Sequence, residues 1–88
     1  MDLRKAKIID VRSAEEFAAG HIENSINIPL HTIPLKIEEI KSMEKPIVFC
    51  CLSGNRSGQA VNFLQANGVE DIYNGGGWEM LNQEIQSL

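Results

Sequence analysis

The 88-residue chain has little of what would mark several classes of protein. Its only cysteines, Cys50 and Cys51, are adjacent, so they would form only a strained disulfide, and two ligands are too few for a structural zinc site. Eight Lys and Arg face twelve Asp and Glu, and no basic stripe typical of a nucleic-acid binder is visible. The longest apolar run, 47–52, is far shorter than the ~20 residues that cross a bilayer. We therefore expect no disulfide scaffold, no metal, no nucleic-acid partner and no membrane span.

What is present is typical of a globular domain. Hydrophobic residues make up 43% of the chain and charged residues 23%, with a formal net charge of −4. The length predicts one domain over residues 1–88, which we expect to be monomeric. The basic N-terminal residues are not followed by the apolar segment of a signal peptide. We therefore expect a cytoplasmic protein, with a periplasmic location as the alternative if the chain is a mature form that has lost its signal peptide.

Short apolar runs alternate with helical patterns along the chain. Four strands are predicted, at residues 7–11, 25–28, 46–50 and 71–73. Helices are predicted at residues 14–19, 34–42, 57–67 and from 78 to the end, with residues 74–77 as a turn. Ser13 and Glu16 are spaced as a capping box for the first helix, which Gly20 ends, and one side of the second is apolar, with Leu30, Ile33, Ile37 and Ile40 at helical spacing. This alternation predicts an α/β fold with a small parallel sheet flanked by helices on both faces. The carboxyl ends of its strands would bring Cys51, Arg12 and the glycine turn near one another.

The most informative segment lies between the third predicted strand and the helix that follows it. Cys51 ends a buried run and is followed by a short polar loop, Leu52 to Arg56. Gly54 and Asn55 tolerate the left-handed conformations that turn successive N–H groups toward one centre, and such a nest beside a helix N-terminus favours an anion. A thiolate there would have a lowered pKa, and Arg56 would add a fork suited to oxyanions. The pattern predicts a cysteine nucleophile in an anion cradle.

Several motifs of this chain, in this order, resemble the rhodanese domain family. They are Ile9-Asp10-Val11-Arg12 with Glu16-Phe17, Gly20-His21-Ile22, Ser25-Ile26-Asn27-Ile28-Pro29, Val48 to Ser57, and the late Gly-Gly pair followed by Trp78. The resemblance implies a rhodanese-like fold and a thiosulfate sulfurtransferase, in which a Cys51 persulfide carries sulfur from thiosulfate or a similar sulfane donor. The implied acceptor is cyanide, a small thiol or a thioredoxin-like protein, and no cofactor is needed beyond the covalent persulfide. The segment before Lys7 is short for the family, so we expect either one edge strand fewer in the sheet or a minimal form of the domain.

The resemblance also assigns roles to individual residues. Cys51 is the expected catalytic residue, and the expected substrate-binding residues are those of the loop: Leu52, Ser53, Gly54, Asn55 and Arg56. The expected supporting residues are Asp10, Arg12, Ser57, Gly76 and Trp78. Simpler roles remain open for some of these residues. The alternative for Arg56 is a surface charge at the helix start or an ion pair, and for Asp10 and Arg12 it is a structural ion pair with Glu16. Trp78 is also suited to the core, and Ser53 and Ser57 to capping the next helix. We assign His21 to local hydrogen bonding.

Spacing separates the two cysteines. Gly54 lies three residues after Cys51 and Arg56 five after it, which resembles the six-residue rhodanese loop. From Cys50 the arginine lies six residues on, as in cysteine-dependent phosphatases, but the glycine is displaced by one position. Strand alternation should point Cys50 into the core. The alternatives to a sulfurtransferase are a non-catalytic rhodanese-like module that carries sulfur or binds a partner, and a phosphatase or arsenate reductase that uses Cys50.

Overall fold

A computed structural model describes residues 1–88 and contains a four-stranded parallel sheet in the order β2-β1-β3-β4. The strands are β1 (Lys7–Asp10), β2 (Ile26–Asn27), β3 (Ile47–Cys51) and β4 (Ile72–Gly77). β3 lies between β1 and β4, and all five of its residues are buried. A strand that is buried on both faces has apolar residues at successive positions, so the sequence alone predicts this strand.

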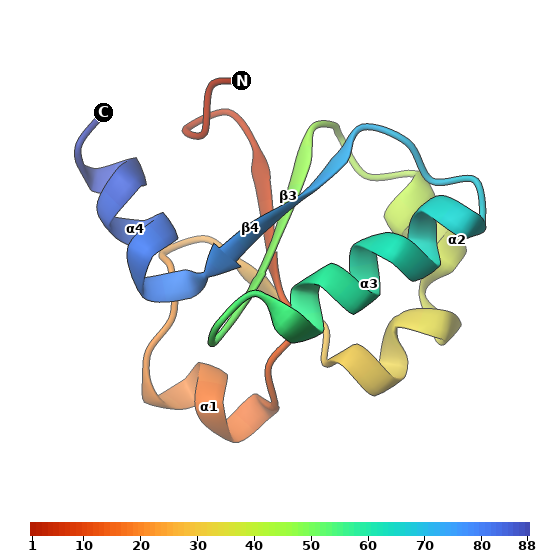
Figure 1. Cartoon of the computed structure of the whole chain (residues 1–88), viewed down its shortest axis with the longest axis horizontal. Coiled ribbons are helices and arrows are strands. Elements are labelled where there is room, and N and C mark those ends of the chain that lie inside the picture. Colours follow the sequence, from red (N-terminus) through yellow and green to blue (C-terminus); the bar gives the residue numbers. More distant parts are fainter.

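Helices cover both faces of the sheet. The helical segments are α1 (Ala14–Ala19), the 3-10 helix η1 (Leu30–Leu35), α2 (Ile37–Lys41), α3 (Asn55–Ala66) and α4 (Trp78–Gln86). Figure 1 shows α4 on one side of the sheet, α2 and α3 on the other, and α1 below the carboxyl ends of the strands. The predicted α/β fold with a flanked parallel sheet is confirmed. None of the helices is long and apolar enough to cross a membrane.

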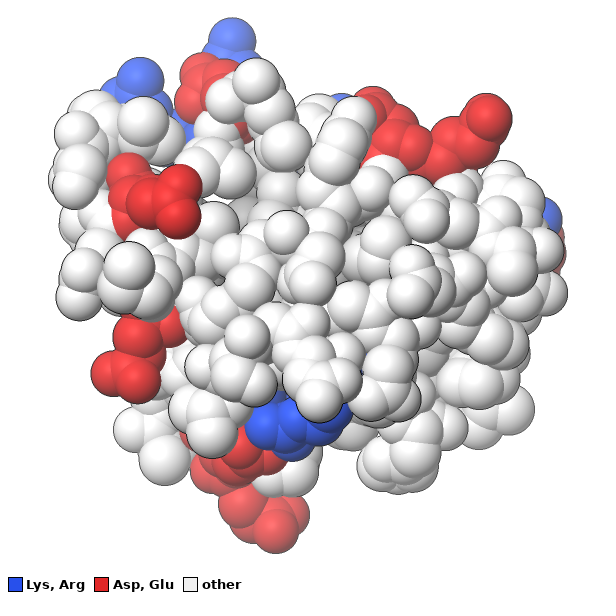
Figure 2. All heavy atoms as spheres, viewed as in Figure 1, with Lys and Arg blue, Asp and Glu red and all other residues white.

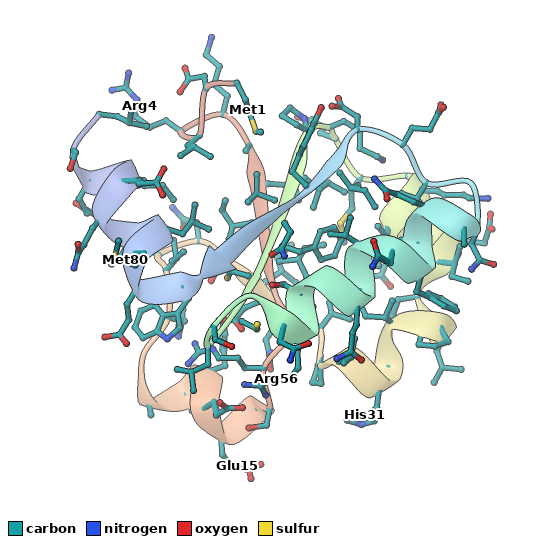
Figure 3. All side chains as sticks on the ribbon, viewed as in Figure 1. Met1, Arg4, Glu15, His31, Arg56 and Met80 are labelled. Carbon is teal, nitrogen blue, oxygen red and sulfur yellow. The ribbon has the colours of Figure 1, made fainter.

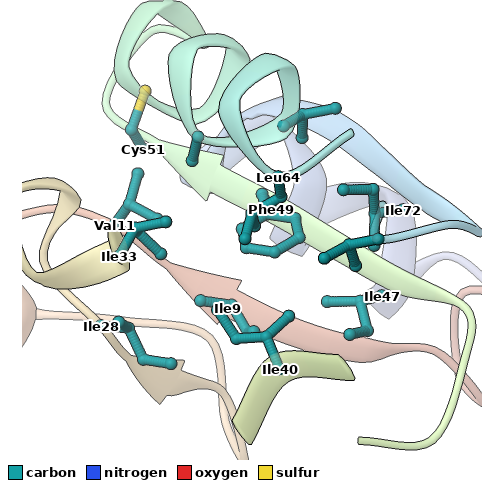
Figure 4. Packing of buried hydrophobic residues seen from close by; sticks show 13 residues of the cluster. Ile9, Val11, Ile28, Ile33, Ile40, Ile47, Phe49, Cys51, Leu64 and Ile72 are labelled. Carbon is teal, nitrogen blue, oxygen red and sulfur yellow. The ribbon is translucent and has the colours of Figure 1, made fainter. Parts of the chain in front are cut away.

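Each face of the sheet buries its own hydrophobic cluster. The larger cluster packs Ile9, Phe49 and Cys51 against Leu64 of α3 and Ile40 of α2 (Figure 4). The smaller cluster lies on the opposite face, and its buried members are Ile8, Ile22, Val48, Cys50 and Leu81. Side chains alternate between faces along a strand, so the two adjacent cysteines belong to different clusters.

The helix predicted over residues 34–42 is wrong in its extent. Two shorter segments replace it: η1, which contains Pro34, and α2, which begins at Ile37. Pro34 is already part of η1, and Lys36, with φ of −118° and ψ of 12°, departs from helical geometry and separates the two segments. The predicted apolar face survives this change, because Ile33 and Ile40 are both fully buried.

The turn predicted over residues 74–77 is also wrong, because these residues complete β4. Phe49 pairs with Asn74 and Cys50 with Gly76, so Gly75 is an extra residue in β4 and forms a β-bulge. A Cβ on Gly75 would lie 2.5 Å from Val48 Cγ1, so no other residue fits there without movement. The glycines therefore permit a bulged strand rather than a turn.

The capping box predicted for α1 is confirmed. Ser13 Oγ accepts a hydrogen bond from the Glu16 amide at 3.2 Å, and Glu16 Oε1 accepts one from the Ser13 amide at 3.1 Å. Gly20 ends the helix, as expected. The box fixes the Glu16 carboxylate at the start of α1, near the carboxyl ends of the strands.

Candidate active site

Cys51 lies at the carboxyl end of β3, and the chain that follows curls around its sulfur. Cys51 Sγ accepts a hydrogen bond from the Gly54 amide at 3.0 Å and lies 3.4 Å from the Ser57 hydroxyl oxygen. The residue is only 1% exposed, and Figure 4 shows its sulfur directed toward α3. The sulfur therefore sits in a shielded site whose nearest polar partners are hydrogen-bond donors.

The loop differs in one respect from the expectation. Gly54 is left-handed, with φ of 98°, but Asn55 is not, because α3 begins at Asn55 rather than at Ser57. Asn55 and Arg56 thus belong to the first turn of the helix. The free N–H groups of that turn lie closer to Cys51 than the sequence indicated, which strengthens the preference for an anion.

The environment shifts the pKa values of the two cysteines in opposite directions. Burial raises the pKa of the Cys51 thiol, but hydrogen bonds from the Ser57 hydroxyl and from the Ser57, Ser53 and Gly54 amides outweigh it, and the net pKa is lowered. Burial raises the pKa of Cys50 to about 12, and the nearby Asp10 carboxylate adds to the effect. Cys51 is therefore the more acidic of the two cysteines, whereas Cys50 remains a thiol at neutral pH.

Asn74 is a part of the site that the sequence did not reveal. Its Oδ1 accepts hydrogen bonds from the Ser57 hydroxyl at 2.7 Å and from the Gly76 amide at 3.0 Å, and its Nδ2 donates to the Gly54 carbonyl at 3.0 Å. One side chain of β4 thus holds the loop, the helix start and the bulge together. The only signal was an asparagine beside three glycines, which is typical of a turn.

Glycines of β4 also allow the backbone of this strand to lie close to the backbone of the loop after Cys51. A Cβ on Gly77 would lie 2.7 Å from the Leu52 carbonyl oxygen, and one on Gly54 would lie 3.2 Å from Gly76 Cα. Gly76 itself is left-handed, with φ of 83°. Gly76 was predicted to support the loop; it lies directly behind it.

Asp10 and Arg12 form a buried ion pair behind the loop. Arg12 Nη2 lies 2.7 Å from Asp10 Oδ2, and Arg12 Nε lies 3.0 Å from both carboxylate oxygens. Arg12 Nη2 also donates to the Gly20 carbonyl at 2.7 Å, and Nη1 donates to the Glu16 carbonyl at 3.3 Å. Trp78 covers this guanidinium, with its ring centroid 4.7 Å from Arg12 Cζ. Arg12 therefore joins the end of β1 to α1 and to the start of α4.

Arg56, predicted to bind an oxyanion, is engaged in an ion pair. Arg56 Nη1 donates to Glu16 Oε1 at 2.7 Å, and Nη2 donates to Oε2 at 3.1 Å. Its hydrogen bonds are the largest influence on the Glu16 carboxyl, whose pKa falls to about 2. The ion-pair alternative is thus present in this structure, although Glu16 pairs with Arg56 and not with Arg12.

The remaining predicted residues surround the site. Leu52 is 58% exposed, and Ser53 and Asn55 are exposed beside it. No side chain caps the N-terminus of α3, so neither serine has the capping role considered for it. His21 Nδ1 lies 2.7 Å from the Phe17 carbonyl oxygen, and its ring stacks on Phe17, which is a local role.

A pocket of about 460 Å³ opens beside this constellation. Its walls come from the segments that follow β1 and β2 and from the start of α3, and they include Val11, Pro29, Leu30, His31 and Arg56. Figure 3 shows Arg56 at the start of α3, with Glu15 and His31 on either side along the same edge of the molecule. Arg56 is the residue of the segment after Cys51 that lines this pocket, so a group held there would lie beside the start of α3.

Comparison with known proteins shows which family this chain resembles. The family model for the rhodanese-like domain matches residues 1–84. The uncharacterized protein YqhL of Bacillus subtilis is 44% identical over 71 residues, which are 81% of this chain and 56% of YqhL, so the chain spans little more than half of that relative. The thiosulfate sulfurtransferase GlpE of Pseudomonas savastanoi pv. phaseolicola is 36% identical over 76 residues, 85% of this chain and 71% of the relative.

A solved structure shows the same fold. The crystal structure of a rhodanese-related protein from Thermoplasma volcanium superposes with a TM-score of 0.79 at 32% identity, covering 94% of this chain and 82% of the other. The chain belongs to the rhodanese-like domain family.

Proposed function

We propose that this protein is a sulfurtransferase that moves sulfane sulfur through a persulfide on Cys51. The observation that carries the proposal is the position of Cys51 Sγ, which lies 3.0 Å from the Gly54 amide in a loop that lowers the pKa of the thiol. Displacement at sulfur requires a thiolate, and the loop favours the thiolate because it lowers the pKa of Cys51. The likeness to thiosulfate sulfurtransferases supports the same reaction class.

The reaction has two displacement steps. The Cys51 thiolate attacks the outer sulfur of a sulfane donor, such as thiosulfate, and the remainder of the donor leaves with the bonding electron pair. The backbone amides of the loop then hold the persulfide that has formed. In the second step a thiophilic acceptor (cyanide, a small thiol or a thioredoxin-like protein) attacks the outer sulfur, and Cys51 leaves as the thiolate that the loop stabilises.

Ser57 and Asn74 support these steps. Ser57 Oγ–H has one proton and two acceptors within reach, Asn74 Oδ1 at 2.7 Å and Cys51 Sγ at 3.4 Å. When Cys51 is a thiolate, rotation of the hydroxyl gives the sulfur a donor. When Cys51 carries a persulfide and its Sγ is uncharged, the proton returns to Asn74. The hydroxyl thus has a partner in both halves of the cycle.

Intact-protein mass spectrometry tests the proposal. After incubation with excess thiosulfate and removal of the donor, the protein should gain the mass of one sulfur atom. The matched pair of variants is Cys51→Ala, which should not gain it, and Cys50→Ala, which should. Uptake by Cys51→Ala, or no uptake by the unmodified protein with any sulfane donor, would contradict the assignment.

Cys50 does not offer a comparable site for phosphatase or arsenate-reductase chemistry. It is fully buried in the smaller cluster, and its pKa is raised to about 12. Turnover of an aryl phosphate by Cys51→Ala would be the result expected of such an activity. We expect none.

A further inference from the structure

The surface around Arg56, which we call the mouth of the cradle, carries no free positive charge. Both terminal nitrogens of Arg56 bind the carboxylate of Glu16, at 2.7 and 3.1 Å, and Arg12 is bound to Asp10 behind the loop. Glu15 lines the same pocket as Arg56 and adds a carboxylate with no cation bound to it. In Figure 2 the basic surface at the lower edge of the molecule lies directly against acidic surface, where Figure 3 labels Arg56 and Glu15. The charged groups around the mouth therefore sum to a slight negative charge.

This arrangement penalises substrates in proportion to their negative charge. The Coulomb energy of a ligand in a given field scales with the charge that it carries, so a dianion responds twice as strongly as a monoanion. A guanidinium that is already paired with a carboxylate attracts a dianion only weakly. It therefore compensates for little of the hydration free energy that the dianion loses when it leaves water. Glu16 occupies the end-on fork formed by Nη1 and Nη2 of Arg56, so only the side-on edge that includes Nε remains for a bidentate contact with an oxyanion.

The pocket beside Arg56 favours a carbon group. Its volume of about 460 Å³ exceeds the needs of a bare inorganic anion, and apolar side chains contribute to its lining, namely Val11, Leu30, Ala14 and Pro29. Thiosulfate has no carbon to place against these side chains. An organic donor would bury its substituent there, where each buried methylene contributes favourably to binding.

We propose that the preferred donors are organic sulfane compounds with at most one negative charge, and that Glu16 sets this preference by neutralising Arg56. The inference rests on the proposed sulfur transfer through Cys51. For an organic persulfide the step is Cys51–S⁻ + R–S–S–H → Cys51–S–S–H + R–S⁻. The bond between Cys51 Sγ and the outer sulfur forms, the donor S–S bond breaks, the leaving thiolate takes the electron pair, and the proton stays on the transferred sulfur.

Three donors that differ in charge and in carbon content test the proposal. They are benzenethiosulfonate (one charge and a ring), methanethiosulfonate (one charge and a methyl group) and thiosulfate (two charges and no carbon). The initial rate of persulfide formation on Cys51, followed by intact mass, gives a half-saturating concentration for each. We expect this concentration to be lowest for benzenethiosulfonate and about tenfold or more higher for thiosulfate, with methanethiosulfonate between them.

The Glu16→Gln variant separates charge from carbon content. Glutamine also completes a capping box, so α1 retains its N-terminal hydrogen bonds. The variant should lower the half-saturating concentration of thiosulfate about tenfold and that of methanethiosulfonate only about threefold, because the factor for a dianion is the square of that for a monoanion. Raised ionic strength should shrink both changes.

Glu70→Gln is the matched control. Glu70 is exposed and precedes β4, at the end of the sheet opposite Cys51, so the substitution changes the net charge equally without touching the mouth. We expect no change for any donor. Equal half-saturation for thiosulfate and benzenethiosulfonate, or equal effects of the two variants, would overturn the inference and leave sulfur transfer intact. Failure of all three donors to load Cys51 would refute the proposed function instead.

Discussion

Removal of one partner from the buried pair of Asp10 and Arg12 should strongly destabilise this domain. Asp10 is 0% exposed and Arg12 is 4% exposed, and three side-chain hydrogen bonds of 2.7 to 3.0 Å join them. Replacing Arg12 with methionine would leave the Asp10 carboxylate buried without its cation, which costs about 3–5 kcal/mol in comparable pairs. At roughly 0.05–0.15 kcal/mol per residue a domain of this length has about 4–13 kcal/mol in total. Arg12→Met should therefore remove a large fraction of the free energy of unfolding.

Urea unfolding followed by circular dichroism measures this loss, and a double variant keeps the test informative if the single variant unfolds. Asp10→Leu with Arg12→Met replaces both charges by apolar groups, so no uncompensated charge stays in the interior. The double variant should be more stable than Arg12→Met alone, and the cycle completed with Asp10→Leu should give a coupling energy of a few kcal/mol. A loss below about 1 kcal/mol for Arg12→Met, or a double variant no more stable than the single one, would refute this reasoning.

Two further predictions concern ionisation at the site. Ser57→Ala removes a donor to the thiolate, so the pKa of Cys51 should rise and the pH profile of its alkylation by iodoacetamide should move to higher pH, whereas an unchanged profile would show that the hydroxyl stays with Asn74. Arg56 lowers the pKa of Glu16 from 4.5 to about 2, so the stability that this pair contributes is fully present above pH 4.5 and is lost as the pH falls toward 2. Acid-unfolding curves of the protein and of Glu16→Gln should therefore converge near pH 2; curves that stay apart there would contradict this.

Local patterns in the sequence account for much of the fold. The capping box at Ser13 and Glu16, the apolar run of β3 and the helical stripe that contains Ile33 and Ile40 depend on residues close together in the chain. The position of Cys51 before a glycine-containing loop and a helix is likewise a local feature. Such features can be predicted from the sequence because each depends on the residues of a single helix, strand or loop.

Contacts between distant segments account for what the sequence could not show. Arg56 lies 40 residues from its partner Glu16, so spacing alone left its role open. The bulge at Gly75 depends on how closely β4 approaches Val48, and the three hydrogen bonds of Asn74 exist only once β4 lies beside α3. In each case tertiary packing decides between conformations that the local sequence permits equally.

The placement of the two cysteines on opposite faces of β3 determines the fate of a modified Cys51. Cys50 lies among Val48 and Leu81 in the smaller cluster, with the strand between it and the sulfur of Cys51. Cys50 therefore cannot attack a persulfide or a sulfenic acid formed on Cys51 and close it as a disulfide with its neighbour. Each chain would then hold a single sulfur for as long as no outside nucleophile reaches it. The lifetime of the loaded protein, and its protection against irreversible oxidation, would be set by the supply of external thiols.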